Sequence, residues 1–205
     1  MKLFITGIGT DVGKTIASAI ITEALQADYW KPIQAGDLAT SDSHKVQQLI
    51  SNTKTRIYPN SYAFTTPASP HLAASLYGIT ISLENITESH TENHLVIEGA
   101  GGLLVPLNDK DTIIDIIKPD YKVVLVSRHY LGSINHTLLS IEALRQRNIT
   151  IAGIIFNGEE NKATEDIILK MSGAVMLGRI EPEPYFDKNV ISEYADDFRE
   201  VLLNL

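Results

Sequence analysis

Short apolar runs alternate along this chain with segments whose apolar residues recur at helical spacing, and this alternation restricts the fold most strongly. The runs are too continuous for strands with one solvated face, so they indicate strands buried on both faces. They are Lys2–Thr6, His94–Glu98, Lys122–Ser127, Thr150–Phe156 and Ala174–Leu177. The helical segments are Lys14–Ala27, Asp42–Ile50, Ser133–Arg147, Ala163–Met171 and Ser192–Leu203. We therefore predict an α/β fold, a mostly parallel sheet flanked by helices on both faces.

Two stretches fit this alternation less well. Asp28–Ile33 forms a further strand only if Pro32 lies at its end, because proline cannot donate a ladder hydrogen bond. Ser51–Ser69 is rich in proline, threonine, serine and asparagine, which predicts a long irregular excursion. Strand signals resume after it, and 205 residues suit one compact domain, so we expect a single domain over residues 1–205.

The composition excludes several classes of partner. Lysine and arginine number 17 against 25 aspartates and glutamates, and the net charge of -8 leaves no basic field for nucleic acid or anionic lipid. The chain has no cysteine, which excludes disulfides and thiolate metal sites. No apolar run approaches the roughly 20 residues that cross a bilayer. We expect a cytoplasmic protein that binds neither nucleic acid nor a membrane.

The segment Gly7–Thr15, GIGTDVGKT, joins the first predicted strand to the first predicted helix. This is the context of a phosphate-binding loop, in which glycines let backbone N–H groups face a phosphate at a helix N-terminus. Lys14 would neutralise the β- and γ-phosphates of ATP, and the Thr15 hydroxyl would ligate magnesium. Ile8 stands where the usual motif has glycine. The alternative is a glycine-rich turn in which Lys14 and Thr15 stand by chance.

Two carboxylates are candidates for further magnesium ligands, since this hard cation prefers oxygen donors. Glu98 ends a predicted strand and precedes Gly99-Ala100-Gly101-Gly102, where small residues let the backbone approach phosphates. An ordinary strand end is the alternative for Glu98. Asp42 lies in Thr40-Ser41-Asp42-Ser43, and this segment also has the composition of a helix N-cap.

Two polar residues after predicted strands have open roles. Lys31, in the segment WKPIQAG, either presents a second cation to a reacting phosphoryl group or is a solvated surface lysine. Asn157 either offers its amide to adenine or forms a turn with Gly158.

Seven blocks stand in order between residue 5 and about residue 157, namely TGIGTDVGKT, WKPIQAG, TSDS, SPHLAA, VIEGAGGLLVPL, LGSINH and AGIIFN. Together they resemble the dethiobiotin synthetases, the ATP-dependent ligases of biotin biosynthesis. The resemblance implies the Rossmann-like architecture of P-loop NTPases and a homodimer with active sites at the subunit interface. The implied substrates are 7,8-diaminononanoate, carbon dioxide and ATP, with Mg2+ as cofactor, and the products are dethiobiotin, ADP and phosphate.

The resemblance also assigns roles to particular residues. Lys14 and Lys31 would be catalytic, stabilising a substrate carbamate and the γ-phosphate, while Thr15, Asp42 and Glu98 would hold magnesium. The implied ATP contacts are Asp11, Val12, Gly13, Lys14, Thr15, Ile16, Asp42, Glu98, Gly99, Ala100, Gly101 and Asn157. The implied substrate contacts are Lys31 and Ala35, with Leu131, Gly132 and Asn135 contributed by a second subunit.

One position and one segment depart from the family pattern. Ala35 stands where the family commonly has serine or threonine, so one substrate hydrogen bond, worth about 0.5 to 1.5 kcal/mol, is lost or supplied elsewhere. The segment Arg179–Pro184 replaces a proline block that usually lines the adenine site.

Other phosphate-loop proteins remain as alternatives. Partitioning and septum-positioning ATPases carry an extra lysine early in the loop, whereas Lys14 is the only lysine between Gly7 and Thr15. A small-molecule kinase would use a lid with several arginines, but the arginines of this chain are scattered. A nucleotide-binding module without a substrate of its own is a further alternative.

Overall fold

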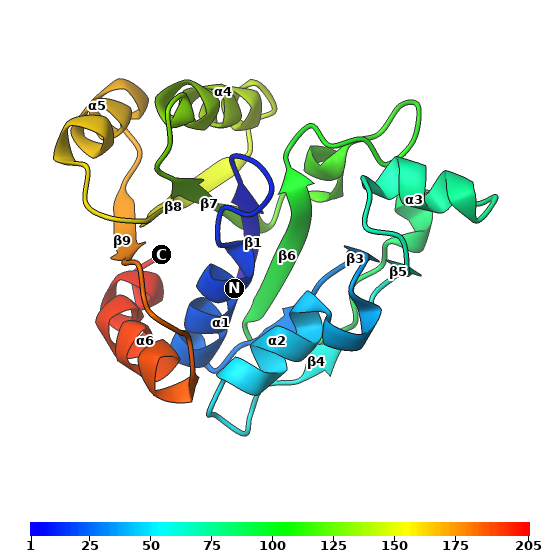
Figure 1. The fold of residues 1–205 in the computed structure, drawn as a ribbon, viewed down its shortest axis with the longest axis horizontal. Coiled ribbons are helices and arrows are strands. Elements are labelled where there is room, and N and C mark those ends of the chain that lie inside the picture. Colours follow the sequence, from blue (N-terminus) through cyan, green and yellow to red (C-terminus); the bar gives the residue numbers. More distant parts are fainter.

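The computed structural model describes residues 1–205, and its centre is a seven-stranded sheet in which neighbouring strands run parallel (Figure 1). Its strand order is β4-β2-β6-β1-β7-β8-β9. The bounds are β1 (Lys2–Gly7), β2 (Asp28–Trp30), β4 (Ile57–Tyr58), β6 (Leu95–Gly102), β7 (Tyr121–Arg128), β8 (Thr150–Asn157) and β9 (Met176–Ile180). A separate parallel pair contains β3 (Ile33–Ala35) and β5 (Tyr62–Phe64). The predicted α/β class is confirmed.

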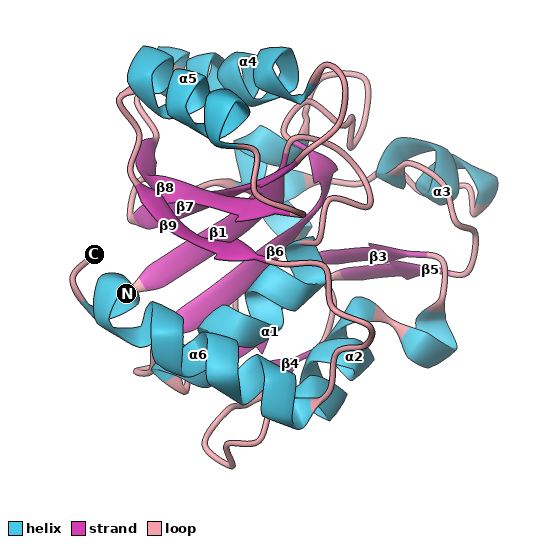
Figure 2. Cartoon of the chain, turned by 60° about the vertical axis from the view of Figure 1, so that its left-hand side comes forward, coloured by secondary structure: helices cyan, strands magenta, loops and turns pink.

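Helices cover both faces of the large sheet, as the turned view shows (Figure 2). On one face lie α1 (Lys14–Leu25), α2 (Asp42–Leu49) and α6 (Lys188–Leu203). On the opposite face lie α4 (Ser133–Gln146) and α5 (Lys162–Ser172). The short α3 (Pro70–Leu76) lies beside the β3–β5 pair. No helix has the length and apolar character needed to cross a membrane.

Successive side chains of the central strands point to opposite faces, which explains their continuous apolar sequences. In β1, Leu3 and Ile5 pack with residues of α1 and α6, whereas Phe4 packs in the cluster on the other face. The apolar residues packed on each face of the sheet are almost completely shielded from solvent. The carboxyl ends of the strands are thus held by a rigid two-sided core, and the loops that follow them are placed side by side.

Several predicted bounds were wrong. The strand predicted over Ala174–Leu177 is Met176–Ile180, and the last helix begins at Lys188 because Asp187 caps it, its carboxylate accepting from the N–H groups of Asn189 and Val190. The stretch predicted as one strand over Asp28–Ile33 is divided at Lys31 and Pro32 into β2 and β3.

The region predicted as irregular, Ser51–Ser69, contains β4 and β5, and α3 follows it without having been predicted. These elements are only two to seven residues long. Such lengths are too short for periodicity to distinguish them from loop. Glu98 is not the last residue of its strand, because β6 continues through the glycines to Gly102.

Candidate functional site

A cavity of about 730 Å³ lies among the loops that follow β1, β2 and β6. Small-molecule sites commonly have volumes of about 300 to 1,000 Å³, so the space suits a nucleotide together with a substrate. The lining residues that the sequence predicted are Asp11, Val12, Gly13, Lys14, Thr15, Ile16, Lys31, Ala35, Asp42, Glu98, Ala100 and Gly101. The fold therefore brings four separate sequence blocks to one place.

The loop from Gly7 to Thr15 is packed so closely that two of its glycines are required. A Cβ added to Gly7 would lie 2.3 Å from Val12 Cγ2. Gly13 has a φ of 96°, and a Cβ there would lie 2.3 Å from Asn157 Nδ2. The same Asn157 amide donates to the Val12 carbonyl oxygen over 2.9 Å. The end of β8 therefore holds the loop from the side, and Asn157 is a loop contact in this structure.

Lys14 is buried within the loop, and its Nζ donates to the carbonyl oxygen of Gly9 over 2.8 Å. Burial lowers the pKa of Lys14 to about 8, and the nearby charge of Lys31 acts in the same direction. At neutral pH most molecules therefore carry an ammonium group at the start of α1. An anion entering the loop would restore the ordinary affinity of this amine for its proton.

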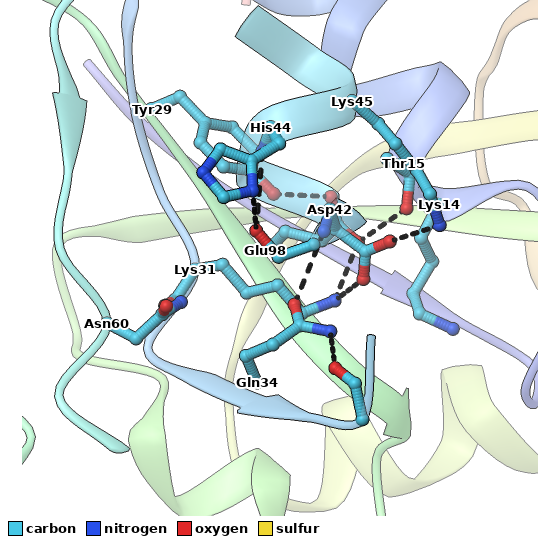
Figure 3. A network of polar contacts seen from close by, with 12 residues as sticks. Lys14, Thr15, Tyr29, Lys31, Gln34, Asp42, His44, Lys45, Asn60 and Glu98 are labelled. Carbon is cyan, nitrogen blue, oxygen red and sulfur yellow. Dashed lines mark hydrogen bonds and ion pairs between the residues drawn. The ribbon is translucent and has the colours of Figure 1, made fainter. Parts of the chain in front are cut away.

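Four side chains from separate blocks meet at the inner wall of the cavity (Figure 3). Glu98 Oε1 accepts from Thr15 Oγ1 over 2.9 Å and from Lys31 Nζ over 3.0 Å. Lys31 also forms an ion pair with Asp42. The side chains of Lys31 and Glu98 are 6% and 1% exposed, so Lys31 is not a solvated surface lysine.

Local structure explains how Lys31 and Asp42 reach this position. Pro32 follows Lys31 and interrupts the strand, while Asn60 Nδ2 donates to the Lys31 carbonyl oxygen over 2.6 Å. The N-cap of α2 is Ser41, whose hydroxyl accepts from the backbone N–H of His44. Asp42 occupies the first turn, so its carboxylate remains available to Lys31.

The ion pairs keep this group charged in spite of its burial. Burial alone favours the neutral amine, but the carboxylates of Glu98 and Asp42 hold the pKa of Lys31 above its ordinary value. Burial likewise opposes ionisation of Asp42, and the ammonium of Lys31 holds the pKa of Asp42 below its ordinary value. The site therefore presents fixed charges of both signs at neutral pH.

The donor set at this wall suits magnesium. One hydroxyl and two carboxylates are all hard oxygen donors, and Thr15 and Glu98 are already within hydrogen-bond distance of each other. No cluster of three or more histidine, aspartate, glutamate or cysteine side chains is suited to a metal ion. A magnesium ion here would accordingly need oxygens from phosphate or water as well, which is its usual coordination beside a nucleotide.

Some predicted residues do not line the cavity. A Cβ on Gly99 would lie 3.1 Å from the ring of Phe4, so Gly99 faces the core. Leu131 is fully exposed, and Gly132 is the N-cap of α4 with a φ of 104°. Asn135 lines a separate hollow with Leu139. Within one chain, the start of α4 is therefore apart from the nucleotide cavity.

Arg179, the first residue of the segment that departs from the family pattern, forms an ion pair within the chain. Arg179 forms a 2.6 Å ion pair with Glu165, which also contacts His129 Nε2 over 2.9 Å. The segment that follows is tied to α6, because Tyr194 Oη accepts from the backbone N–H of Glu181. No proline from this segment lines the cavity described above.

Sequence reasoning missed several residues of the site. Gln34, Lys45 and Ser69 line the cavity, which is also lined by Ala35. The i,i+3 spacing from Asp42 to Lys45 would have been a usable signal. Tyr29 was missed as well, although its hydroxyl donates to Glu98 Oε2 over 2.8 Å.

Comparisons with known proteins identify relatives of this chain. A family model described as an AAA domain matches residues 1–190. A protein of Christiangramia forsetii named ATP-dependent dethiobiotin synthetase BioD is 59% identical over 202 residues, which cover 98% of each chain. A protein of Cytophaga hutchinsonii with the same name is 50% identical over 196 residues, or 95% of each chain.

Solved structures show the same fold at low sequence identity. The MinD cell division protein of Aquifex aeolicus has a TM-score of 0.63 and 15% identity, covering 100% of this chain and 97% of that one. The cell division ATPase MinD of Pyrococcus furiosus has a TM-score of 0.61 and 12% identity, covering 98% and 99%. At these identities the likeness concerns the fold alone.

Proposed function

This chain belongs to the ATP-dependent dethiobiotin synthetase family, and on that basis we propose that its cavity binds MgATP and closes the urea ring of dethiobiotin. The observation that carries the proposal is the meeting of Thr15, Lys31, Asp42 and Glu98 at one wall of the cavity that Lys14 also lines. Residues 1–205 would act as one ATP-binding ligase domain in the cytoplasm.

The loop and its neighbours would hold the triphosphate. Lys14 would leave the carbonyl of Gly9 and pair with the β- and γ-phosphates, while backbone N–H groups from Gly13 to Ile16 would face the anion at the start of α1. Thr15, Asp42 and Glu98 would hold Mg2+, which supplies positive charge to the phosphate oxygens. The free oxygen of the Asn157 amide would contact adenine.

The chemistry would proceed through a carbamate. One amine of 7,8-diaminononanoate attacks carbon dioxide and loses a proton, and a carbamate oxygen then attacks the γ-phosphorus as the bond to ADP breaks. The second amine attacks the carbamate carbon, and phosphate leaves as the ring closes. Lys31, held charged by Glu98 and Asp42, would neutralise the anionic oxygens of the carbamate and the transferring phosphoryl group.

The substrate carboxylate would bind at the start of α4 of a second subunit, at Leu131, Gly132 and Asn135. Two features support a homodimer of this kind. Leu131 is a large apolar side chain with full exposure, and the start of α4 does not line the nucleotide cavity of its own chain. A helix N-terminus is a favourable site for a carboxylate.

The test is to incubate the protein with 7,8-diaminononanoate, bicarbonate and MgATP, and to measure ADP and dethiobiotin by mass spectrometry. We expect both products in equal amounts, and no dethiobiotin when the diamine is omitted. ADP release that is independent of the diamine, with no cyclic urea, would contradict the proposal and favour a nucleotide switch. Sedimentation and activity on dilution would test the dimer.

A further inference from the structure

Tyr29 is a fully buried residue of β2 that the proposed reaction does not use directly. Its hydroxyl donates to Glu98 Oε2 over 2.8 Å, on the side of the carboxylate away from Thr15 and Lys31 (Figure 3). The ring of Tyr29 packs in the apolar cluster beneath the cavity, so the hydroxyl is the only part of this side chain that reaches the site.

The contact is set by the pairing of two neighbouring parallel strands. Tyr29 pairs with Val96 and Trp30 with Ile97, so β2 and β6 are in register at this point. Because side chains alternate along a strand, Tyr29 and Glu98 both project to the face covered by α1, whereas Trp30 and Ile97 pack together on the other face. The register of the two strands therefore brings the Tyr29 hydroxyl to the Glu98 carboxylate.

The two oxygens of Glu98 are consequently divided between two tasks. Oε2 accepts only from Tyr29, while Oε1 accepts from Thr15 and Lys31, two residues that line the cavity. Burial raises the pKa of Tyr29 well above its ordinary value, and the charge of Glu98 acts in the same direction. A phenol is protonated at neutral pH, so Tyr29 is the donor in this hydrogen bond.

We propose that Tyr29 is a positioning residue that occupies Glu98 Oε2 and so leaves Oε1 alone to meet the magnesium ion of the nucleotide. This inference rests on the proposed binding of MgATP. Mg2+ requires near-octahedral geometry at short distances, whereas Ca2+ accepts both oxygens of one carboxylate at longer distances. A metal ion would take the place of Thr15 and Lys31 at Oε1, and a carboxylate whose other oxygen stays bonded to a buried phenol favours the smaller ion. Tyr29 would accordingly contribute both metal affinity and metal choice.

The chain offers a matched control for the loss of a buried phenol. Tyr121 is also almost fully buried, and its hydroxyl donates to a glutamate, Glu88. This pair lies at the start of β7, at the amino end of the sheet, and Tyr121 and Glu88 do not line the nucleotide cavity. Tyr121→Phe removes the same hydroxyl from a glutamate that is partly exposed and lies away from the metal.

The experiment measures binding of ADP by calorimetry to the full chain, at a series of Mg2+ concentrations and then of Ca2+ concentrations. Mg2+ should increase the affinity of the protein for ADP. In Tyr29→Phe we expect the Mg2+ concentration that gives half of this increase to rise about tenfold, the usual effect of losing a hydrogen-bond partner of a metal ligand. We expect a smaller change with Ca2+ and no change in metal-free ADP binding. Tyr121→Phe should match the unsubstituted protein in all three.

Other outcomes would overturn the inference. Equal Mg2+ dependence in Tyr29→Phe and the unsubstituted protein would do so. In a Glu98→Gln background Tyr29→Phe should have no further effect on the Mg2+ dependence, and an undiminished effect would show that Tyr29 does not act through Glu98. If the unsubstituted protein binds no ADP, the proposed function itself fails.

Discussion

Two groups of one tyrosine, one glutamate and one lysine lie at opposite ends of the sheet, and they differ in burial. The carboxyl-edge group consists of Tyr29, Glu98 and Lys31, and the amino-edge group consists of Tyr121, Glu88 and Lys2. In both groups the phenol and the ammonium donate to the same carboxylate. The Lys31 side chain is 6% exposed, however, whereas that of Lys2 is 29% exposed.

The surroundings of the two lysines show what this difference means. Lys2 contacts Glu88 over 2.5 Å and Asp120 over 2.9 Å, and water can reach all three groups. Such pairs contribute only about 0 to 1 kcal/mol to stability. Lys31 and Glu98 have lost their water, which costs free energy that the ion pair does not always recover. A buried group of this kind is expected where the charge serves binding or catalysis.

The largest expected difference between the two groups is in turnover. Lys31→Ala should lower kcat by at least about 100-fold, because the carbamate and phosphoryl oxygens lose a preorganised cation. ADP binding should change much less, since Lys14 remains in the loop. Lys2→Ala should leave kcat within about twofold of the unsubstituted protein, because its ion pairs stay at the surface. Steady-state assays with calorimetric ADP binding would measure both, and similar losses of kcat in the two variants would refute the distinction.

An intermediate effect is expected from pH at the carboxyl edge. Because burial lowers the pKa of Lys14 to about 8, its ammonium is lost as pH rises through that value, and nucleotide affinity should fall by up to about tenfold per pH unit above it. Binding of ADP between pH 7 and pH 9.5 would measure this. Lys14→Arg keeps its charge in this range and should remove the dependence. A flat profile in the unsubstituted protein would contradict the role given to Lys14.

The smallest expected effect concerns stability at the amino edge. Although burial opposes ionisation, the hydrogen bond from Lys2 holds the pKa of Glu88 below its ordinary value. A carboxyl group with a depressed folded-state pKa stabilises the protein above its unfolded pKa, and this contribution disappears as pH falls through the folded value. Glu88→Gln should lower the free energy of unfolding by about 1 kcal/mol at pH 7, and by less at acid pH.

Urea denaturation at pH 7 and near pH 3.5 would measure this difference, with Glu84→Gln as the control. Glu84 is exposed on the same connection and its carboxylate has no partner, so its replacement should have little effect at either pH. A loss of stability in Glu88→Gln that is equal at both pH values would show that the ionised carboxylate is not what stabilises this edge.

The sequence predicted the fold well where the physical signal is local. Strands buried on both faces, such as Val123–Val126 within β7, have continuous apolar sequences. A glycine-rich loop that leads from such a strand into a helix beginning with lysine and threonine is typical of phosphate binding. Short elements such as β4 and α3 were missed because they lack a full period of either pattern.

The carboxyl-edge group was predicted only in part. Lys31 and Glu98 follow or end apolar runs, which marked them as candidates. Tyr29 could not be found in this way, because its partner depends on β2 lying beside β6 in the sheet, and periodicity along one strand carries no information about its neighbour. Likewise, the role of Ser41 as the cap that frees Asp42 depends on backbone geometry that composition does not specify.

The close approach of Gly13 to Asn157 constrains how this protein can change over evolutionary time. A side chain at position 13 would collide with the amide, and position 157 must fill the same space with a donor for Val12. Because Gly13 also has a φ of 96°, a side chain there would be strained whatever residue stands at position 157, so position 13 is fixed and only position 157 can vary. A library randomised at both positions and selected for growth without biotin should therefore return glycine at position 13 throughout, with residues at position 157 that can donate to the Val12 carbonyl.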